Sequence, residues 1–336
     1  MGNLCNEEGF PHFDQTGIER LIEYGARQAG DRNKVLASYA EVADLVREAG
    51  FWARKEDRQL ASARHVEQAL QSRAFRSNRI EEQIRELIAN RTILVDTDGR
   101  KVGQVNGLSV MDIGGYAFGR PSRVTASVSM GQAWIVNIER ESHLSGNIHD
   151  KGVLILAGYL RNRFGQSQPL ALSASLCFEQ SYSGVEGDSA SSTELYALLS
   201  RLANAPLRQD MAVTGSVNQW GEVQAIGGVN EKIEGFYDVC RIAGLTGKQG
   251  VLIPESNVRH LVLRSDVIQA VADSKFHIYP VRTIDDGLAI LTSMPANGGV
   301  NERHVNRAVS ERLKELALGL KEFAATGRDG TIEPKP

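Results

Sequence analysis

The chain has 336 residues, enough for two domains or one large one. Its 42% hydrophobic and 24% charged residues are an ordinary globular composition. A net charge of −3 argues against a general nucleic-acid-binding protein, so we expect no nucleic-acid partner. The three cysteines are widely spaced and provide neither a disulfide framework nor a Cys-x-x-Cys metal site.

The sequence also lacks signals for export or membrane insertion. Its first eight residues, Met-Gly-Asn-Leu-Cys-Asn-Glu-Glu, contain no basic region followed by an apolar core. No apolar run approaches the roughly 18 residues that span a bilayer. We therefore expect a soluble protein of the cytoplasm, without a membrane partner.

Residues 1–92 are predicted to form a small all-α domain. Ile18, Leu21 and Ile22 mark one amphipathic helix, the run from Val42 to Trp52 marks a second, and residues 62–90 mark a third. Arg and Glu are abundant between the apolar positions, as on the exposed faces of a small helical bundle.

Residues 93–296 are predicted to form an α+β domain, because strand-like segments begin at Thr92 and alternate irregularly with helices. We expect strands at 92–96, 102–110, 123–130, 133–140, 170–179, 211–217, 250–253 and 275–281. We expect helices at 152–164, 190–203, 227–244 and 283–292. Residues 297–336 are predicted to be a C-terminal helix, at 301–324, and a loose tail from Gly327.

Lys232 is a charge on the wrong face of the predicted helix 227–244. Around it, one helix face carries Val229, Ile233, Phe236, Val239, Cys240 and Ala243. We expect the opposite face, with Glu231, Glu234, Asp238 and Arg241, to be solvated. A buried ammonium must be paired or lose its proton, and a neutral lysine is a base. The alternative is an ordinary lysine whose stem is buried while its amine reaches solvent.

Ser189 stands at the start of another predicted helix. Gly184 and Gly187 allow the preceding backbone to turn sharply, and the helix N-terminus can stabilise an oxyanion. The alternative is a serine that only caps the helix. Together with Lys232, however, Ser189 supplies the two parts of a Ser-Lys dyad.

Three segments, which follow one another as in the family, resemble the proteolytic domain of Lon proteases, most closely the LonB-like branch. They are Glu186-Gly-Asp-Ser-Ala-Ser191, then Thr214-Gly-Ser through Ile226-Gly-Gly-Val-Asn-Glu-Lys232, and, earlier in the chain, residues 146–160. The resemblance covers residues 92–295. It implies a Lon-type Ser-Lys protease domain, whose partners are unfolded polypeptides and further copies of the chain in a hexameric ring.

The resemblance also implies a role for each matching residue. Ser189 would be the nucleophile, Lys232 the general base, and Thr214 would hydrogen-bond and orient the lysine amine. Thr214 could also be an ordinary β-branched strand residue. Backbone N–H groups around Ser189 would form the oxyanion hole. Asp188 and Ser191 depart from the Asp-Gly-Pro-Ser-Ala-Gly loop of bacterial-type Lon and agree with the LonB-like form, in which the acid can interact with the lysine.

Residues 13–27 and the helices after them resemble the helical lid of the AAA+ ATPase module that precedes the Lon protease domain. No Gly-x-x-x-x-Gly-Lys-[Ser/Thr] phosphate loop occurs in the sequence. The expectation is therefore a fragment of an ATP-dependent protease without its nucleotide-binding core. It would hold no cofactor, and ATP with Mg²⁺ would bind only a longer form.

Metal-dependent hydrolysis is not expected. No His-Glu-x-x-His occurs, and His143 and His149 have no acidic third ligand at the required spacing. Two alternatives to an active protease stay open: a latent protease, and a non-enzymatic Lon-like module that serves oligomer assembly.

Overall fold

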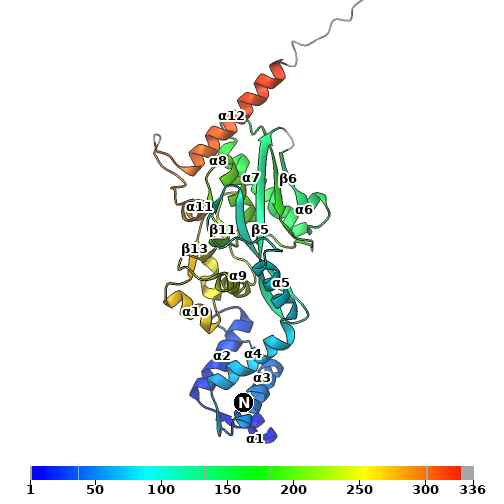
Figure 1. Cartoon of the computed structure of the whole chain (residues 1–336), viewed down its shortest axis with the longest axis vertical. Coiled ribbons are helices and arrows are strands. Elements are labelled where there is room, and N and C mark those ends of the chain that lie inside the picture. Colours follow the sequence, from blue (N-terminus) through cyan, green and yellow to red (C-terminus); the bar gives the residue numbers. More distant parts are fainter. Residues whose placement is uncertain (1, 37, 132–133, 183, 300–301, 327–336) are drawn as a thin grey trace, which may run out of the picture.

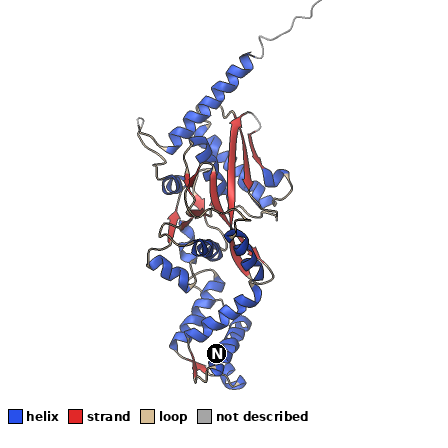
Figure 2. Ribbon diagram, in the orientation of Figure 1, coloured by secondary structure: helices blue, strands red, loops and turns tan. Residues whose placement is uncertain are grey.

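A computed structural model describes residues 2–36, 38–131, 134–182, 184–299 and 302–326. Figure 1 shows an elongated molecule, with the N-terminal helices at one end and α12 (Val305–Thr326) projecting from the other. The strands lie mainly in the middle of the molecule (Figure 2). The architecture is α+β behind a helical N-terminal part, which confirms the predicted fold class. No helix of the described residues is long and apolar enough to cross a membrane.

The N-terminal part is helical, as predicted. It contains α1 (Gly2–Glu8), α2 (Gln15–Ala29), α3 (Tyr39–Lys55), α4 (Ala63–Ser77) and α5 (Arg79–Ala89), with a short parallel pair, β1 (His12–Phe13) and β2 (Leu60–Ala61). Asp14 begins α2, since its carboxylate accepts the Gly17 N–H at 2.9 Å. Leu21, Leu45, Val46 and Val66 form the core of this bundle.

A seven-stranded mixed sheet forms the centre of the remaining chain. Its order is β13 (His277–Val281), β12 (Gly250–Pro254), β9 (Met211–Val213), β4 (Gln104–Asp112), β5 (Ala117–Met130), β7 (Leu172–Phe178) and β6 (Trp134–Asn137). The β4–β5 and β5–β7 pairs are antiparallel and the others are parallel. Two short antiparallel pairs lie outside the sheet: β3 (Arg100–Lys101) with β8 (Leu207–Arg208), and β10 (Ser216–Val217) with β11 (Val223–Gln224).

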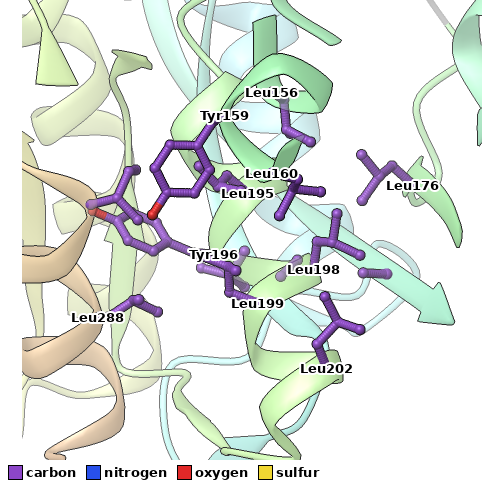
Figure 3. Close-up of a cluster of buried hydrophobic side chains, with 14 of the residues drawn as sticks. Leu156, Tyr159, Leu160, Leu176, Leu195, Tyr196, Leu198, Leu199, Leu202 and Leu288 are labelled. Carbon is purple, nitrogen blue, oxygen red and sulfur yellow. The ribbon is translucent and has the colours of Figure 1, made fainter. Parts of the chain in front are cut away.

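The two faces of the sheet carry separate cores. Along β9, Met211 and Val213 join one core while Ala212 between them joins the other, as the two-residue repeat of a strand requires. The larger core packs α7 (Asn147–Phe164), α8 (Ser191–Ala203), α11 (Ile284–Thr292) and α12 on the sheet. Figure 3 shows the leucines of α8 within it, beside Leu156 and Leu160 of α7. The smaller core packs α9 (Val229–Ala243) and α10 (Ser265–Ala272) on the other face.

Helix α9 lies against β5 with almost nothing between the two backbones. A Cβ built on Gly235 would overlap the Gly119 carbonyl, and a Cβ on Gly119 would overlap the backbone of Glu231. Only glycine allows the helix this close to the strand. The contact sets the depth of α9 on the sheet.

The polar face of α9 is not solvated, contrary to the expectation. Glu234 and Asp238 are both buried. Arg27 from α2 binds Glu234, and Arg85 from α5 and Arg264 bind Asp238. The helical pattern identifies the charged face correctly, but the arginines that neutralise it come from distant parts of the chain. Arg241 alone among the four charged side chains of this face is mostly exposed.

Some predicted elements differ in the structure. Residues 92–96 form no strand; the Leu94 N–H instead bonds to the Gln180 side chain at 2.8 Å. The strand expected at 133–140 ends at Asn137, whose side chain caps α6 (Ile138–Glu141) by accepting the Arg140 N–H. The strand expected at 211–217 divides into β9 and β10 around Thr214 and Gly215. Helices α1, α10 and the 3-10 helix η1 (Glu255–His260) were not predicted. The predicted tail, 327–336, lies outside the described residues.

Candidate active site

Ser189 lies in the loop between β7 and α8. Gly187 has a φ of +84°, which a glycine adopts without strain, and it turns the chain toward the start of α8. The loop is tied to the segment after β9, because Gly215 N–H donates to the Ser189 carbonyl at 2.8 Å and Ser192 N–H donates to the Gly215 carbonyl at 3.1 Å. Ala190 occupies the N-cap position of α8, and no side chain caps this helix. The capping alternative for Ser189 is therefore not what the structure shows.

Lys232 lies in the first turn of α9 and is 3% exposed. Its Nζ donates a hydrogen bond of 2.9 Å to Ser189 Oγ. The lysine amine therefore neither reaches solvent nor pairs with a carboxylate at hydrogen-bond distance among the described residues. The structure brings the two predicted dyad residues together.

Burial lowers the pKa of Lys232 from 10.5 to about 8. The negative charges of Asp188 and Glu231 oppose this shift without cancelling it. A substantial fraction of the amine is thus neutral at mildly alkaline pH. A neutral amine has a lone pair that can accept the proton of Ser189.

Thr214 makes a different contact from the one expected. Its Oγ1 donates to the Ser189 carbonyl oxygen at 3.3 Å, and it forms no hydrogen bond with Lys232. The reason is its position directly after β9, where the Gly215 N–H bonds to the same carbonyl. In this structure Thr214 holds the backbone of Ser189 rather than the amine of the lysine.

Asp188, next to Ser189, binds Ser216. The Ser216 hydroxyl donates to Asp188 Oδ2 at 2.7 Å, and Val217 N–H donates to the hydroxyl of Ser191 at 3.1 Å. Both contacts fasten the serine loop to β10. The carboxylate that could hold the Lys232 amine is therefore engaged by a hydroxyl, while the amine faces Ser189.

A buried acidic group behind the loop was missed by sequence reasoning. Glu194 in α8 is fully buried; Asn137 donates to its Oε1 at 2.9 Å, and His149 Nε2 lies 3.7 Å from the same oxygen. Burial, with a smaller contribution from the charge of Glu139, raises the pKa of Glu194 to about 8. The sequence feature that could have identified it is the one used for Lys232, a charged residue on the apolar face of a helix. Glu194 stands one helical turn before Leu198 on the apolar face of α8.

The described residues contain no group of three or more His, Cys, Asp or Glu side chains arranged to hold a metal ion. The polar groups around Ser189 are the hydroxyls of Thr214, Ser191 and Ser216, the Lys232 amine, the Asp188 carboxylate and backbone amides. They are suited to proton transfer and to acyl transfer.

Comparison with known proteins agrees with this arrangement. Residues 12–76 match the family model described as "Archaeal LonB, AAA+ ATPase LID domain". Residues 182–293 match the model described as "Lon protease (S16) C-terminal proteolytic domain". The second match includes Ser189, Thr214 and Lys232.

Whole-chain relatives give the same result. A "Putative Lon protease homolog" of Escherichia coli (strain K12) is 40% identical over 306 residues, covering 88% of this chain and 50% of the relative. A homologue with the same name in Haemophilus influenzae is 39% identical, covering 83% and 46%. An "Archaeal Lon protease" of Archaeoglobus fulgidus is 30% identical, covering 92% and 46%. The chain spans about half the length of these curated relatives. It belongs to the Lon protease family, with a LonB-type lid domain followed by a Lon-type proteolytic domain.

Proposed function

We propose that this protein is a serine endopeptidase that cleaves unfolded polypeptides, with Ser189 as nucleophile and Lys232 as general base. The observation that carries the proposal is the 2.9 Å contact between the buried Lys232 amine and Ser189 Oγ. Because burial keeps the pKa of that amine near 8, the base is available at a pH where a free lysine would be charged.

The reaction uses a single proton shuttle. The neutral amine takes the proton of Ser189 as Oγ attacks the carbonyl carbon of the scissile bond, and the resulting ammonium returns a proton to the leaving amine. Water then hydrolyses the acyl-enzyme with the amine again acting as base.

The N-terminus of α8 supplies the oxyanion donors in this proposal. The Ser191 and Ser192 N–H groups already bond to the Asp188 and Gly215 carbonyls. The N–H groups of Ser189 and Ala190 are therefore the proposed donors, and the dipole of α8 adds to their effect.

The family resemblance supports the wider setting. We propose that the chain works in the cytoplasm within a hexameric ring, as part of an ATP-dependent protease. The 336 residues contain no phosphate-loop sequence, so the nucleotide and Mg²⁺ would act outside them. Unfolded chains fit this proposal because an enclosed chamber admits extended polypeptides.

The test is hydrolysis of an unfolded, fluorescently labelled protein by wild type, Ser189→Ala and Lys232→Ala. Ser77→Ala and Lys248→Ala change exposed residues of the same types and are the matched controls. We expect the controls to match wild type and the two site variants to lose at least about a hundredfold in rate. Equal cleavage by all five proteins would contradict the dyad. Absence of cleavage by all five, with an intact oligomer by light scattering, would favour the latent or non-enzymatic alternative.

A further inference from the structure

A small pocket opens beside Ser189. Its volume is about 190 Å³, and Ser189 itself forms part of its wall. Sites for whole small molecules are larger, roughly 300–1,000 Å³, so this pocket is suited to one side chain. Its apolar wall comes from β4, the end of β7 and the serine loop: Leu108, Val110, Met111, Phe178, Val185 and Ala190.

Arg120 from β5 is the one basic residue among the described residues that line this pocket. One of its terminal nitrogens, Nη2, donates to the Gln180 carbonyl at 3.2 Å. Its Nε is buried without a hydrogen-bond partner, and no described carboxylate lies within 4.0 Å of the guanidinium. Burial lowers the pKa of Arg120, with no opposing contribution from an acidic group.

Other partly buried arginines of the described chain are paired. Arg27 binds Glu234, Arg85 and Arg264 bind Asp238, and Arg123, three residues after Arg120, binds Asp96 at 3.0 Å. A partly buried cation without an anion carries an uncompensated desolvation cost. An anion bound in this pocket would offset the desolvation cost of Arg120, which makes Arg120 a candidate anion-binding group.

The pocket also contains an acidic side chain, Glu186, but it does not neutralise Arg120. Glu186 is exposed, and its carboxylate lies over Gly146, where a Cβ would overlap it. It makes no contribution to the pKa of Arg120. Its carboxylate is instead directed to the start of α7, where its charge opposes the lowering of the His149 pKa by burial.

We propose that Arg120 is a specificity-determining residue that selects substrates with a glutamate or aspartate side chain next to the scissile bond. This inference rests on the proposed function. The substrate carboxylate pairs with the guanidinium, and its methylene stem contacts the apolar wall formed by Leu108, Met111 and Phe178. Such a pair is a charge-assisted hydrogen bond, which is stronger than a bond between neutral groups.

The test compares peptides that differ only in Glu against Gln at each of the two positions flanking one cleavage site. Glu and Gln have nearly the same shape, so the ratio of their kcat/KM values isolates the charge. For wild type we expect a preference of about tenfold or more for Glu at one of the two positions. In Arg120→Gln the ratio should fall to about one, while Arg120→Lys should retain part of it.

Arg123→Gln is the matched control, because it removes an arginine from the same strand outside the pocket. It should retain the wild-type ratio, and circular dichroism checks that each variant is folded. A wild-type ratio near one, or a ratio that Arg120→Gln leaves unchanged, would overturn the proposed specificity alone. Failure of wild type to cleave any peptide or an unfolded protein would instead contradict the proposed function, and the specificity with it.

Discussion

Arg27 of the helical N-terminal part forms two hydrogen bonds with Glu234, two residues after Lys232 in α9, at 2.5 and 2.8 Å. The same guanidinium reaches Glu231, directly before the lysine, at 3.1 Å. The two carboxylates that flank Lys232 in sequence are thus held by one cation from the lid domain. The helix that presents the proposed base is fastened to the lid as well as to the sheet.

Arg27→Ala should destabilise the chain by about 3 kcal/mol. It leaves Glu234 buried with only the Arg264 N–H as a partner, and removing one member of a buried pair costs roughly 3–5 kcal/mol. Urea unfolding followed by circular dichroism measures the loss. Arg47→Ala, which breaks a more exposed pair with Glu8, should cost much less, because water screens an exposed ion pair. Equal losses in the two variants would show that the Arg27 contact is not a buried pair in solution.

Peptidase activity should rise with pH through about 8, because only neutral Lys232 accepts the proton of Ser189. The negative charge of Asp188 raises the pKa of Lys232, so Asp188→Asn should move this rise to lower pH. The measurement is kcat/KM from pH 6 to pH 10. Asp44→Asn changes an exposed acid of the lid domain and should leave the profile unmoved. If neither variant moves the profile, the charge of Asp188 does not act on the pKa of Lys232.

Lys232→Met should make the protein more stable as it abolishes activity. Folding lowers the pKa of Lys232 from 10.5 to about 8, which corresponds to about 3 kcal/mol of lost ammonium stabilisation below pH 8. That cost disappears as pH rises from 8 to 10.5, since only the unfolded chain still binds the proton in this range. Loss of the hydrogen bond to Ser189 offsets about 1 kcal/mol of the stability that is gained by removing the buried ammonium. We therefore expect a net gain of about 2 kcal/mol at pH 7 in denaturant titration, shrinking by pH 10. A loss of stability at pH 7 would mean that the ammonium is well paired in solution.

Glu194→Gln should change the pH dependence of stability. Glu194 has a raised pKa of about 8 in the folded chain against 4.5 when unfolded, so its contribution is complete below pH 4.5 and lost as pH rises through 8. Wild type should therefore lose about 3 kcal/mol between pH 5.5 and pH 8.5 from this group alone. The variant should show a shallower decline by that amount, whereas Glu7→Gln, at an exposed position, should not. Parallel curves for wild type and Glu194→Gln would show that the buried carboxyl does not hold its proton.

The sequence predicted most helices and strands within a few residues because their apolar periodicity is strong, as in β7 and α9. The position of Lys232 on an apolar arc predicted that its stem is buried but left open whether its amine reaches solvent; the structure buries the whole side chain. Contacts between distant segments could not be predicted in the same way. The partner of Thr214 depends on how β9 ends against the serine loop, and the burial of Glu234 and Asp238 depends on arginines far away in the chain. Arg120 gave no signal in the sequence, since only the fold shows that it has no carboxylate beside it.

The contact between Gly119 and Gly235 bears on how the site can vary. Where two backbones touch, no rotamer change can absorb an error, so a single added methyl group would tilt or lift the whole of α9. Lys232 lies three residues before Gly235, and its amine would move with the helix, whereas Ser189 is held in the loop before α8, which packs in the other core. The distance between the Lys232 amine and Ser189 Oγ therefore depends on two glycines, Gly119 and Gly235, that have no side chain and take no part in the reaction.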